Sequence, residues 1–167
     1  MNDAYVEWLV AKKPNPLLPI LKALCYIIAA VCLCIGMGSW IFLIPAAGFA
    51  VVAYMVIPMF DLEYEYTYFD KEITIDKIMA KEKRKRVRVV ELGKVDVMAP
   101  NNSHELDSYR ARKLPVADYS SRLAEPLNKP YTLVYNGEKG TELICIEPND
   151  EMLKAIKTVM PRKVVEY

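Results

Sequence analysis

The stretch ALCYIIAAVCLCIGMGSWIFLIPAAGFAVVAYMVIPMF, from Ala23 to Phe60, contains no Asp, Glu, Lys, Arg or His. A bilayer-spanning helix needs about 20 apolar residues, and this stretch, extended back to Leu17, covers roughly two such lengths. A helix packed on a soluble core would show a polar stripe of helical period, and none is present. A cleaved signal peptide is disfavoured because Asp3 and Glu7 precede the stretch. The sequence therefore predicts two membrane spans.

The break between the two spans falls at residues 36–39, where GMGS supplies two glycines and a serine. We therefore expect a two-helix transmembrane hairpin over residues 17–60, with spans at 17–35 and 40–60. Pro45 predicts a kink in the second span, and Pro58 predicts its end. Small residues in the second span favour close packing between the spans or between copies of the chain: Ala46, Ala47, Gly48, Ala50 and Ala53.

Lysine and arginine in the flanks predict the orientation, since cytoplasmic loops keep the positive charge. Lys12, Lys13 and Lys22 flank the first span, and the turn between the spans carries no charge. Residues 1–16 are thus expected to form a cytoplasmic N-terminal segment, and residues 61–167 a cytoplasmic domain. This organisation is that of a multi-pass cell-membrane protein with both termini in the cytoplasm.

Beyond Phe60 the hydrophobic period changes to two. In LEYEYTYF, residues 62–69, the apolar and aromatic side chains alternate with Glu63, Glu65 and Thr67, which predicts a strand. Further strands are expected in ITIDKIMA, KRKRVRVVEL, residues 95–99 and LPVADYS, and YTLVY with TELICIE reads as a hairpin. A C-terminal helix over 150–160 follows the N-cap Asn149 and ends before Pro161.

About six or seven strands closed by one amphipathic helix form an antiparallel barrel or sandwich. This order, with the EYTYFDKEITI, VRVVELGKV and PNDEMLKAIK segments, resembles the bacterial pleckstrin-homology-like (PH-like) domains, including the YcxB-like proteins. The whole chain also resembles a family of small, uncharacterised two-span membrane proteins of Gram-positive (Firmicutes) bacteria. These resemblances imply a mostly-β PH-like domain behind a membrane hairpin, and they bring no catalytic motif.

A dense basic cluster lies in the third expected strand and the turn before it: Lys81, Lys83, Arg84, Lys85, Arg86 and Arg88. Such clusters near a cytoplasmic bilayer surface bind anionic lipid head groups. The plainer interpretation is a solvated hairpin whose arginines face water. In phosphoinositide-binding PH domains the basic residues sit in the first hairpin, which here is residues 70–72 (DKE), so the resemblance argues against specific phosphoinositide recognition.

Catalytic, metal and cofactor sites are not expected. The only histidine is His104 in a polar loop, the four cysteines show no zinc spacing, and no G-x-S-x-G, P-loop or H-E-x-x-H motif occurs. An enzymatic reading would need a cleft joining His104, Glu105 and Asp107. Nucleic-acid binding is not expected either, because the net charge is only +1 and no recognition motif accompanies the basic cluster.

Tyr109 and Tyr119, in the irregular segment, are candidate contacts for a protein partner. The sequence thus favours a non-enzymatic, membrane-anchored interaction module that presents its domain at the cytoplasmic face. Its expected partners are the lipid bilayer and either a protein or another copy bound through the spans. The alternative is a small accessory subunit of a larger membrane transporter or secretion complex.

Overall fold

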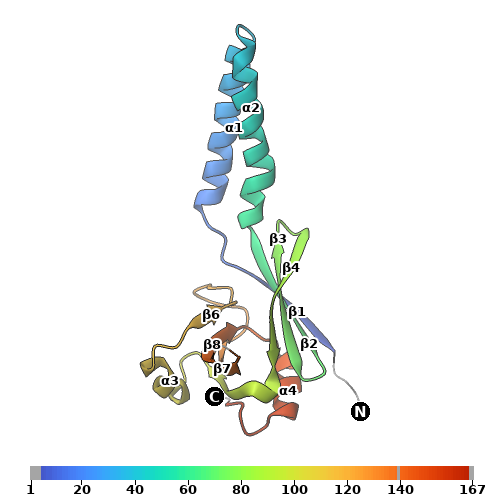
Figure 1. Ribbon diagram of the computed structural model, residues 1–167, viewed down its shortest axis with the longest axis vertical. Helices are drawn as coiled ribbons and strands as arrows, with labels where there is room; N and C mark the ends of the chain where they lie inside the picture. Colours follow the sequence, from blue (N-terminus) through green and yellow to red (C-terminus); the bar gives the residue numbers. More distant parts are fainter. Residues whose placement is uncertain (1–4, 139, 166–167) are drawn as a thin grey trace. The chain divides into compact units, whose positions relative to one another are not determined.

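The computed structural model describes residues 5–138 and 140–165. The chain folds into two compact units. The helical unit comprises Pro14–Leu62 and the short segment Ile78–Lys83, and the β unit comprises the remaining residues on either side of them. Figure 1 shows the elements of both units.

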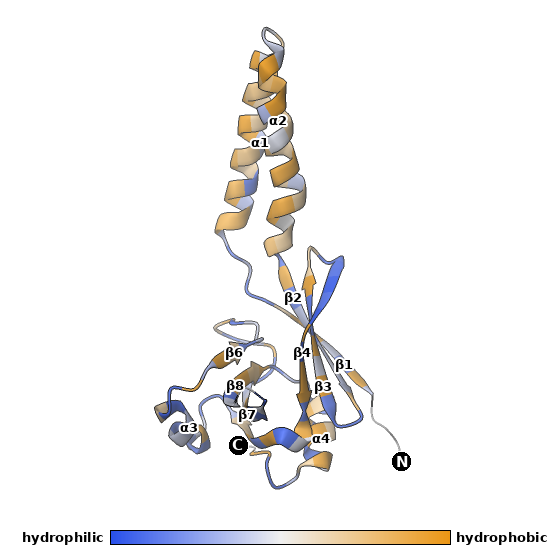
Figure 2. Cartoon of the chain, in the orientation of Figure 1, coloured by the Kyte–Doolittle hydropathy of each residue, from blue (hydrophilic) through white to orange (hydrophobic). Residues whose placement is uncertain are grey.

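Two antiparallel apolar helical segments make up most of the helical unit (Figure 1). The first is α1 (Leu17–Gly36), whose 20 residues give a length of about 30 Å. The second begins with a 3₁₀ turn, η1 (Trp40–Phe42), continues as α2 (Leu43–Val51) and a π-helical turn, η2 (Val52–Val56), and ends in the 3₁₀ turn η3 (Ile57–Phe60). Figure 2 shows both segments coloured mostly as hydrophobic.

The expected break between the segments is confirmed, since α1 ends at Gly36. A Cβ on Gly36 would lie 2.7 Å from Leu43 Cδ2, so glycine permits this close approach. The second segment differs from expectation, because it is not one regular helix. Its irregularity lies at Val52–Val56, whereas Pro45 sits in the first turn of α2, where the lost N–H costs little. Among the described residues only α1 is long and apolar enough to cross a membrane, and Trp40–Val56 forms a shorter apolar helix.

Two four-stranded sheets form the β unit, in the orders β1-β2-β3-β4 and β5-β7-β8-β6. The first sheet contains β1 (Val6–Ala11), β2 (Leu62–Phe69), β3 (Glu72–Met79) and β4 (Lys83–Glu91). The second contains β5 (Val95–Pro100), β6 (Val116–Asp118), β7 (Tyr131–Gly137) and β8 (Gly140–Ile146). The short 3₁₀ turn η4 (Leu92–Lys94) links the sheets, and η5 (His104–Leu106) leads into α3 (Asp107–Ala111).

One core joins both sheets to the C-terminal helix α4 (Asp150–Val159). The alternation in β2 places Tyr64, Tyr66 and Tyr68 in this core, as the period-two pattern predicts. Met152 and Ile156 bring α4 against it, and Asn149 caps the helix by accepting a hydrogen bond from the Met152 N–H at 2.8 Å. The predicted helix, its cap and the hairpin of β7 and β8 are therefore confirmed.

The N-terminal segment corrects the expected domain boundaries. Residues 1–16 are not only a segment ahead of the hairpin, because β1 pairs with β2 from Val6 opposite Tyr68 to Ala11 opposite Glu63. Val10 is buried in the core and Trp8 packs against it. The β domain thus begins before the helices, which are inserted between its first two strands. The described residues contain eight strands, and β6 pairs with β8 in parallel rather than antiparallel fashion.

Candidate functional site

The turn of the β3–β4 hairpin leads into the strongly basic start of β4 (hydrophilic blue in Figure 2). Ala80 and Lys81 adopt positive φ angles of 55° and 58°, the conformation of a tight two-residue hairpin turn. The Ala80 N–H donates to the Asp61 carbonyl at 3.1 Å, so the turn is held beside the residue that follows the second apolar segment. Residues Ile78–Lys83 accordingly pack with the helical unit.

The structure divides the predicted basic cluster into two groups according to ion pairing. Arg84 Nη2 lies 2.8 and 2.7 Å from the two carboxylate oxygens of Glu65, and Arg86 Nε lies 3.8 Å from Asp76. Arg88 pairs with Glu142 and lies over the Tyr135 ring. All three arginines therefore face acidic partners.

The lysines behave differently. Lys81, Lys83 and Lys85 are exposed, and none forms an ion pair with the residues that the structure describes. Lys83 and Lys85 lie two residues apart on β4 and so point to the same side of the strand. We call these three residues the basic tip. It is the part of the predicted cluster whose charge is available to a ligand.

Glu65 is the buried end of the arginine pairs. It is only 5% exposed, although the alternation of β2 predicts an outward position. Burial raises the pKa of this carboxyl, and the neighbouring Glu7 side chain raises it further, while Arg84 lowers it. Arg84 thus neutralises a carboxylate whose surroundings disfavour its charge.

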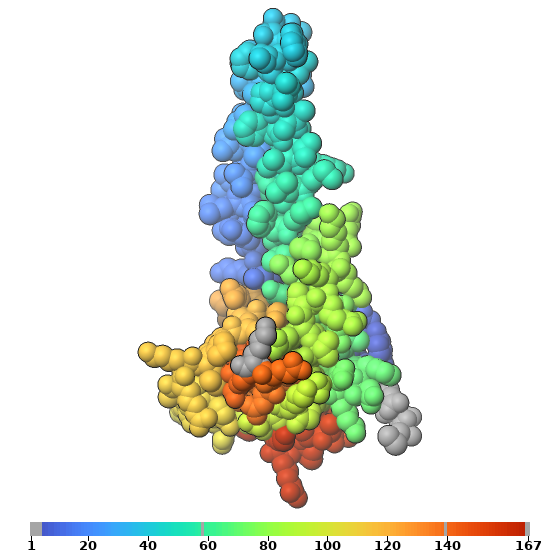
Figure 3. Space-filling view, in the orientation of Figure 1, coloured from blue at the N-terminus to red at the C-terminus, as the bar shows by residue number. Residues whose placement is uncertain are grey.

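Tyr109 and Tyr119 lie in different parts of the β unit. Tyr109 on α3 packs against a small second core, and the Arg112 guanidinium lies 5.4 Å from its ring centroid. Figure 3 shows the α3 region as a yellow projection on the surface. Tyr119 is half-buried and meets the Tyr64 ring edge-to-face at 5.5 Å. The two tyrosines therefore form no single contact surface.

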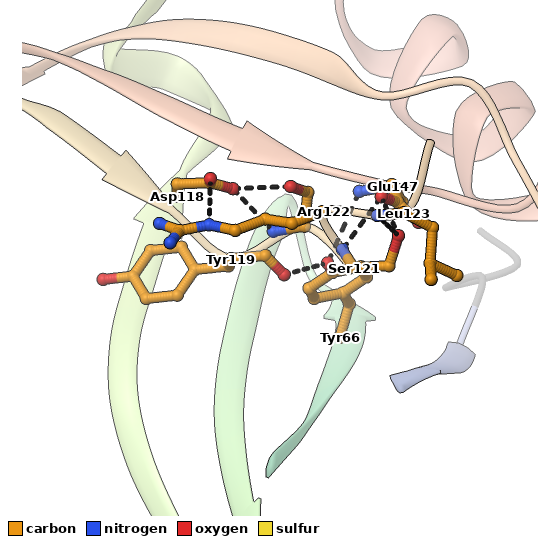
Figure 4. A network of polar contacts seen from close by, with 8 residues as sticks. Tyr66, Asp118, Tyr119, Ser121, Arg122, Leu123 and Glu147 are labelled. Carbon is orange, nitrogen blue, oxygen red and sulfur yellow. Dashed lines mark hydrogen bonds and ion pairs between the residues drawn. The ribbon is translucent and has the colours of Figure 1, made fainter. Parts of the chain in front are cut away.

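The structure contains a buried polar network close to Tyr119 that the sequence did not predict (Figure 4). The Tyr66 hydroxyl donates to the Tyr119 carbonyl at 2.7 Å and accepts from the Glu147 N–H at 3.4 Å. Both the N–H and the hydroxyl of Ser121 donate to Glu147 Oε1, at 2.9 and 2.7 Å. No sequence motif marks this network, since its members are single polar residues far apart in the chain.

The same loop is bound to the N-terminal segment, because the Lys13 N–H donates to the Ser121 carbonyl at 2.7 Å. Arg122 Nε donates to Asp118 Oδ2 at 2.6 Å, and Ser120 donates to the other oxygen of that carboxylate. Burial favours a higher pKa for Asp118, but these hydrogen bonds outweigh it and the pKa is lowered. The segment from Asp118 to Arg122 is thus held by the N-terminal segment and by hydrogen bonds among its own side chains.

His104 lies on the exposed η5–α3 corner, where its Nδ1 is 3.1 Å from Asp107 Oδ2. A cavity of 370 Å³ beside β4, β7 and β8 is lined by Arg88, Tyr135 and Glu142 among others, and His104 is not in its lining. Within the described residues, no group of three or more His, Cys, Asp or Glu side chains is placed to hold a metal ion.

The chain matches the family described as Bacterial PH-like domain (DUF6106) over residues 2–166. The match includes β1 and the helical insertion as well as the second strand onward. No significant similarity is found to a curated protein or to a solved structure. The Firmicutes origin and the two-span family drawn from the resemblance stay predictions, whereas the PH-like domain is confirmed. The chain therefore belongs to the bacterial PH-like domain family DUF6106, and its family domain extends over nearly its whole length.

Proposed function

We propose that this protein is a non-enzymatic module anchored in the cell membrane, which holds its PH-like domain at the cytoplasmic face and contacts anionic lipid through the basic tip. The observation that carries the proposal is the hydrogen bond of 3.1 Å between Ala80 and Asp61. It fixes an unpaired lysine cluster beside the end of an uncharged apolar segment.

The surface of the helical unit supports the anchoring. Few of its apolar side chains are buried, and large ones such as Ile27, Ile44 and Tyr54 are 61%, 68% and 74% exposed. Exposed apolar surface on this scale calls for a covering of lipid or protein. The length of α1, about 30 Å, equals the hydrocarbon thickness of a bilayer. In our proposal the segment Trp40–Phe60 returns across the same bilayer.

The orientation rests on charge. The turn at residues 37–39 carries none, whereas Lys12 and Lys13 precede α1 and the basic tip lies next to Asp61. The positive-inside rule then places both ends of the hairpin, and with them the β unit, in the cytoplasm. The anionic lipids of the cytoplasmic leaflet face the basic tip in this orientation.

The three lysines should contribute most to lipid binding, because they form no ion pairs with the described residues. A lysine near an anionic surface gains about 1 kcal/mol, so Lys81 and Lys83 together are worth about 2 kcal/mol, a factor of roughly 30 in the ratio of bound to free tip. The arginines contribute less, because Glu65, Asp76 and Glu142 already balance their charges.

The test uses the full chain in nanodiscs, because β1 makes a fragment starting at residue 61 incomplete. Glu82→Cys, in a background without Cys25, Cys32, Cys34 and Cys145, carries a spin label at the tip. We expect phosphatidylglycerol to shift the label toward an immobilised, lipid-contacting population, and high salt to reverse the shift.

Lys81→Gln together with Lys83→Gln should remove most of this shift, while the matched control Lys154→Gln on α4 should leave it intact. A label that responds equally in neutral and anionic nanodiscs, or that ignores the two lysine substitutions, would contradict the proposed lipid contact.

An accessory subunit of a larger membrane complex is the alternative function. Its main support is the small-residue face of the second segment. In the structure Ala46 and Ala53 are buried within the hairpin, where Ala53 packs with Cys25 and Ile57. Ala47 and Gly48 are exposed, so the packing within the hairpin takes up only part of the small-residue face.

A further inference from the structure

The loop that follows β6 has a rigid base. Ser121 is 2% exposed, and its N–H and hydroxyl both donate to Glu147 Oε1, a carboxylate of a residue that is itself 3% exposed. The Leu123 N–H in turn donates to the Ser121 hydroxyl oxygen at 3.1 Å. The backbone at Leu123 is therefore held by a buried anchor, and the direction of its side chain is set by the fold.

This base lies close along the chain to the start of the helical unit. The Lys13 N–H donates to the Ser121 carbonyl at 2.7 Å, and only Pro14, Asn15 and Pro16 separate Lys13 from the first residue of α1. Extended residues span at most about 3.5 Å each, so this tether is short. The Asn15 side chain shortens it further by accepting from the Leu17 N–H at 3.0 Å.

The surface around the base combines cations, the half-buried Tyr119 and an exposed leucine. Lys12 Nζ lies 5.8 Å from the centroid of the Tyr64 ring, which is itself buried in the core. Tyr119 meets that ring edge-to-face and is the tyrosine that reaches the surface. Leu123 is 43% exposed beside the exposed Arg122. Amphipathic tyrosines, long basic side chains and an apolar tip are the residues that proteins place at the boundary between head groups and acyl chains.

We propose that Leu123 inserts into the interfacial region of the leaflet that α1 enters, with Lys12 among the head groups above it. This inference rests on the proposed membrane anchoring. The domain is then held to the bilayer at both ends of the insertion. Ala80, next to the basic tip, is bonded to Asp61 after the second segment, and Ser121, in the Leu123 loop, is bonded to Lys13 before the first. The occupant of the surface is the lipid bilayer itself.

The experiment measures the depth of three spin labels on the full chain, in the cysteine-free background, in nanodiscs of phosphatidylcholine and phosphatidylglycerol. The labels replace Leu123, Tyr54 on the second apolar segment, and Ser108, an exposed position on α3. Collisions with dissolved oxygen and with a water-soluble nickel chelate report depth. We expect Tyr54→Cys to be deep, Leu123→Cys to lie at the interface with an oxygen-to-nickel ratio several-fold above that of Ser108→Cys, and Ser108→Cys to be aqueous.

The outcomes separate the two proposals. If Tyr54→Cys is deep but Leu123→Cys matches Ser108→Cys, the loop contact is wrong and the anchoring stands. If Tyr54→Cys is aqueous, the anchoring itself is wrong. A Leu123→Cys label shielded from both oxygen and nickel would indicate a protein partner or a second copy on this surface, and would also overturn the lipid contact.

Discussion

Replacing Tyr66 with phenylalanine should destabilise the β unit by removing one hydroxyl that joins three elements. The hydroxyl on β2 donates to the Tyr119 carbonyl after β6 and accepts from the Glu147 N–H after β8. Tyr66 is fully buried and Glu147 is only 3% exposed, so water has little access to the groups that the hydroxyl leaves behind. A buried polar group left without a partner costs about 1–3 kcal/mol. Because the Glu147 bond is long at 3.4 Å, we expect a total of about 2–4 kcal/mol.

The matched control is Tyr64→Phe, the same chemical change two residues away on the same face of β2. Its hydroxyl has no hydrogen bond to the described residues, so the change should stay within about 0.5 kcal/mol. Thermal unfolding of the full chain in mild detergent, followed by near-ultraviolet circular dichroism, measures both. A loss of 2–4 kcal/mol corresponds to a drop in Tm on the order of 10 °C. Equal Tm values for the two variants would refute the bridging role of Tyr66.

Three further predictions concern the same unit. Val10→Asn should lower the free energy of unfolding by about 3 kcal/mol, because Val10 is 6% exposed in the core. Leu9→Asn, on the opposite face of β1, should be nearly neutral. Urea unfolding measures both variants, and equal effects would argue against β1 as a core strand. The raised pKa of Glu65 means that the folded state binds its proton more tightly than the unfolded state, so unfolding free energy should fall as pH rises from 4.5, and this decline should be missing in Glu65→Gln. Burial raises the pKa of Cys145 to about 11. In a variant without the three α1 cysteines, its thiol should therefore resist maleimide at pH 8 until urea unfolds the domain. Fast labelling of the folded protein would contradict its burial.

Local sequence patterns predicted much of the fold. The alternation of tyrosines in β2, the glycine break after α1 and the Asn149 cap are signals within a few residues of one another, and all three were predicted correctly. The strand β1 was not predicted, because VEWLVA is short and its pattern is hidden by the much longer apolar stretch that follows it. Its role depends on pairing with Leu62–Phe69, which is separated from it by the whole helical insertion.

The candidate site was predicted only in outline. Sequence located the basic cluster but could not separate its lysines from its arginines, because the acidic partners Glu65, Asp76 and Glu142 come from other strands. The Tyr66, Ser121 and Glu147 network likewise depends on long-range contacts between isolated polar residues. Burial of Glu65 was contrary to the strand pattern, since the covering group is the long side chain of Arg84 from β4.

The most direct test asks whether the helical insertion crosses the membrane while both flanks of the β unit stay on one side. Single cysteines at Ser39 in the turn, Leu9 on β1 and Ser108 on α3 are introduced into the cysteine-free background and exposed to a membrane-impermeant maleimide. In intact cells we predict labelling of Ser39→Cys alone, with Leu9→Cys and Ser108→Cys labelled only after the membrane is opened. Labelling of all three positions before permeabilisation, or of Ser39→Cys only after it, would contradict a membrane hairpin inserted into a cytoplasmic PH-like domain.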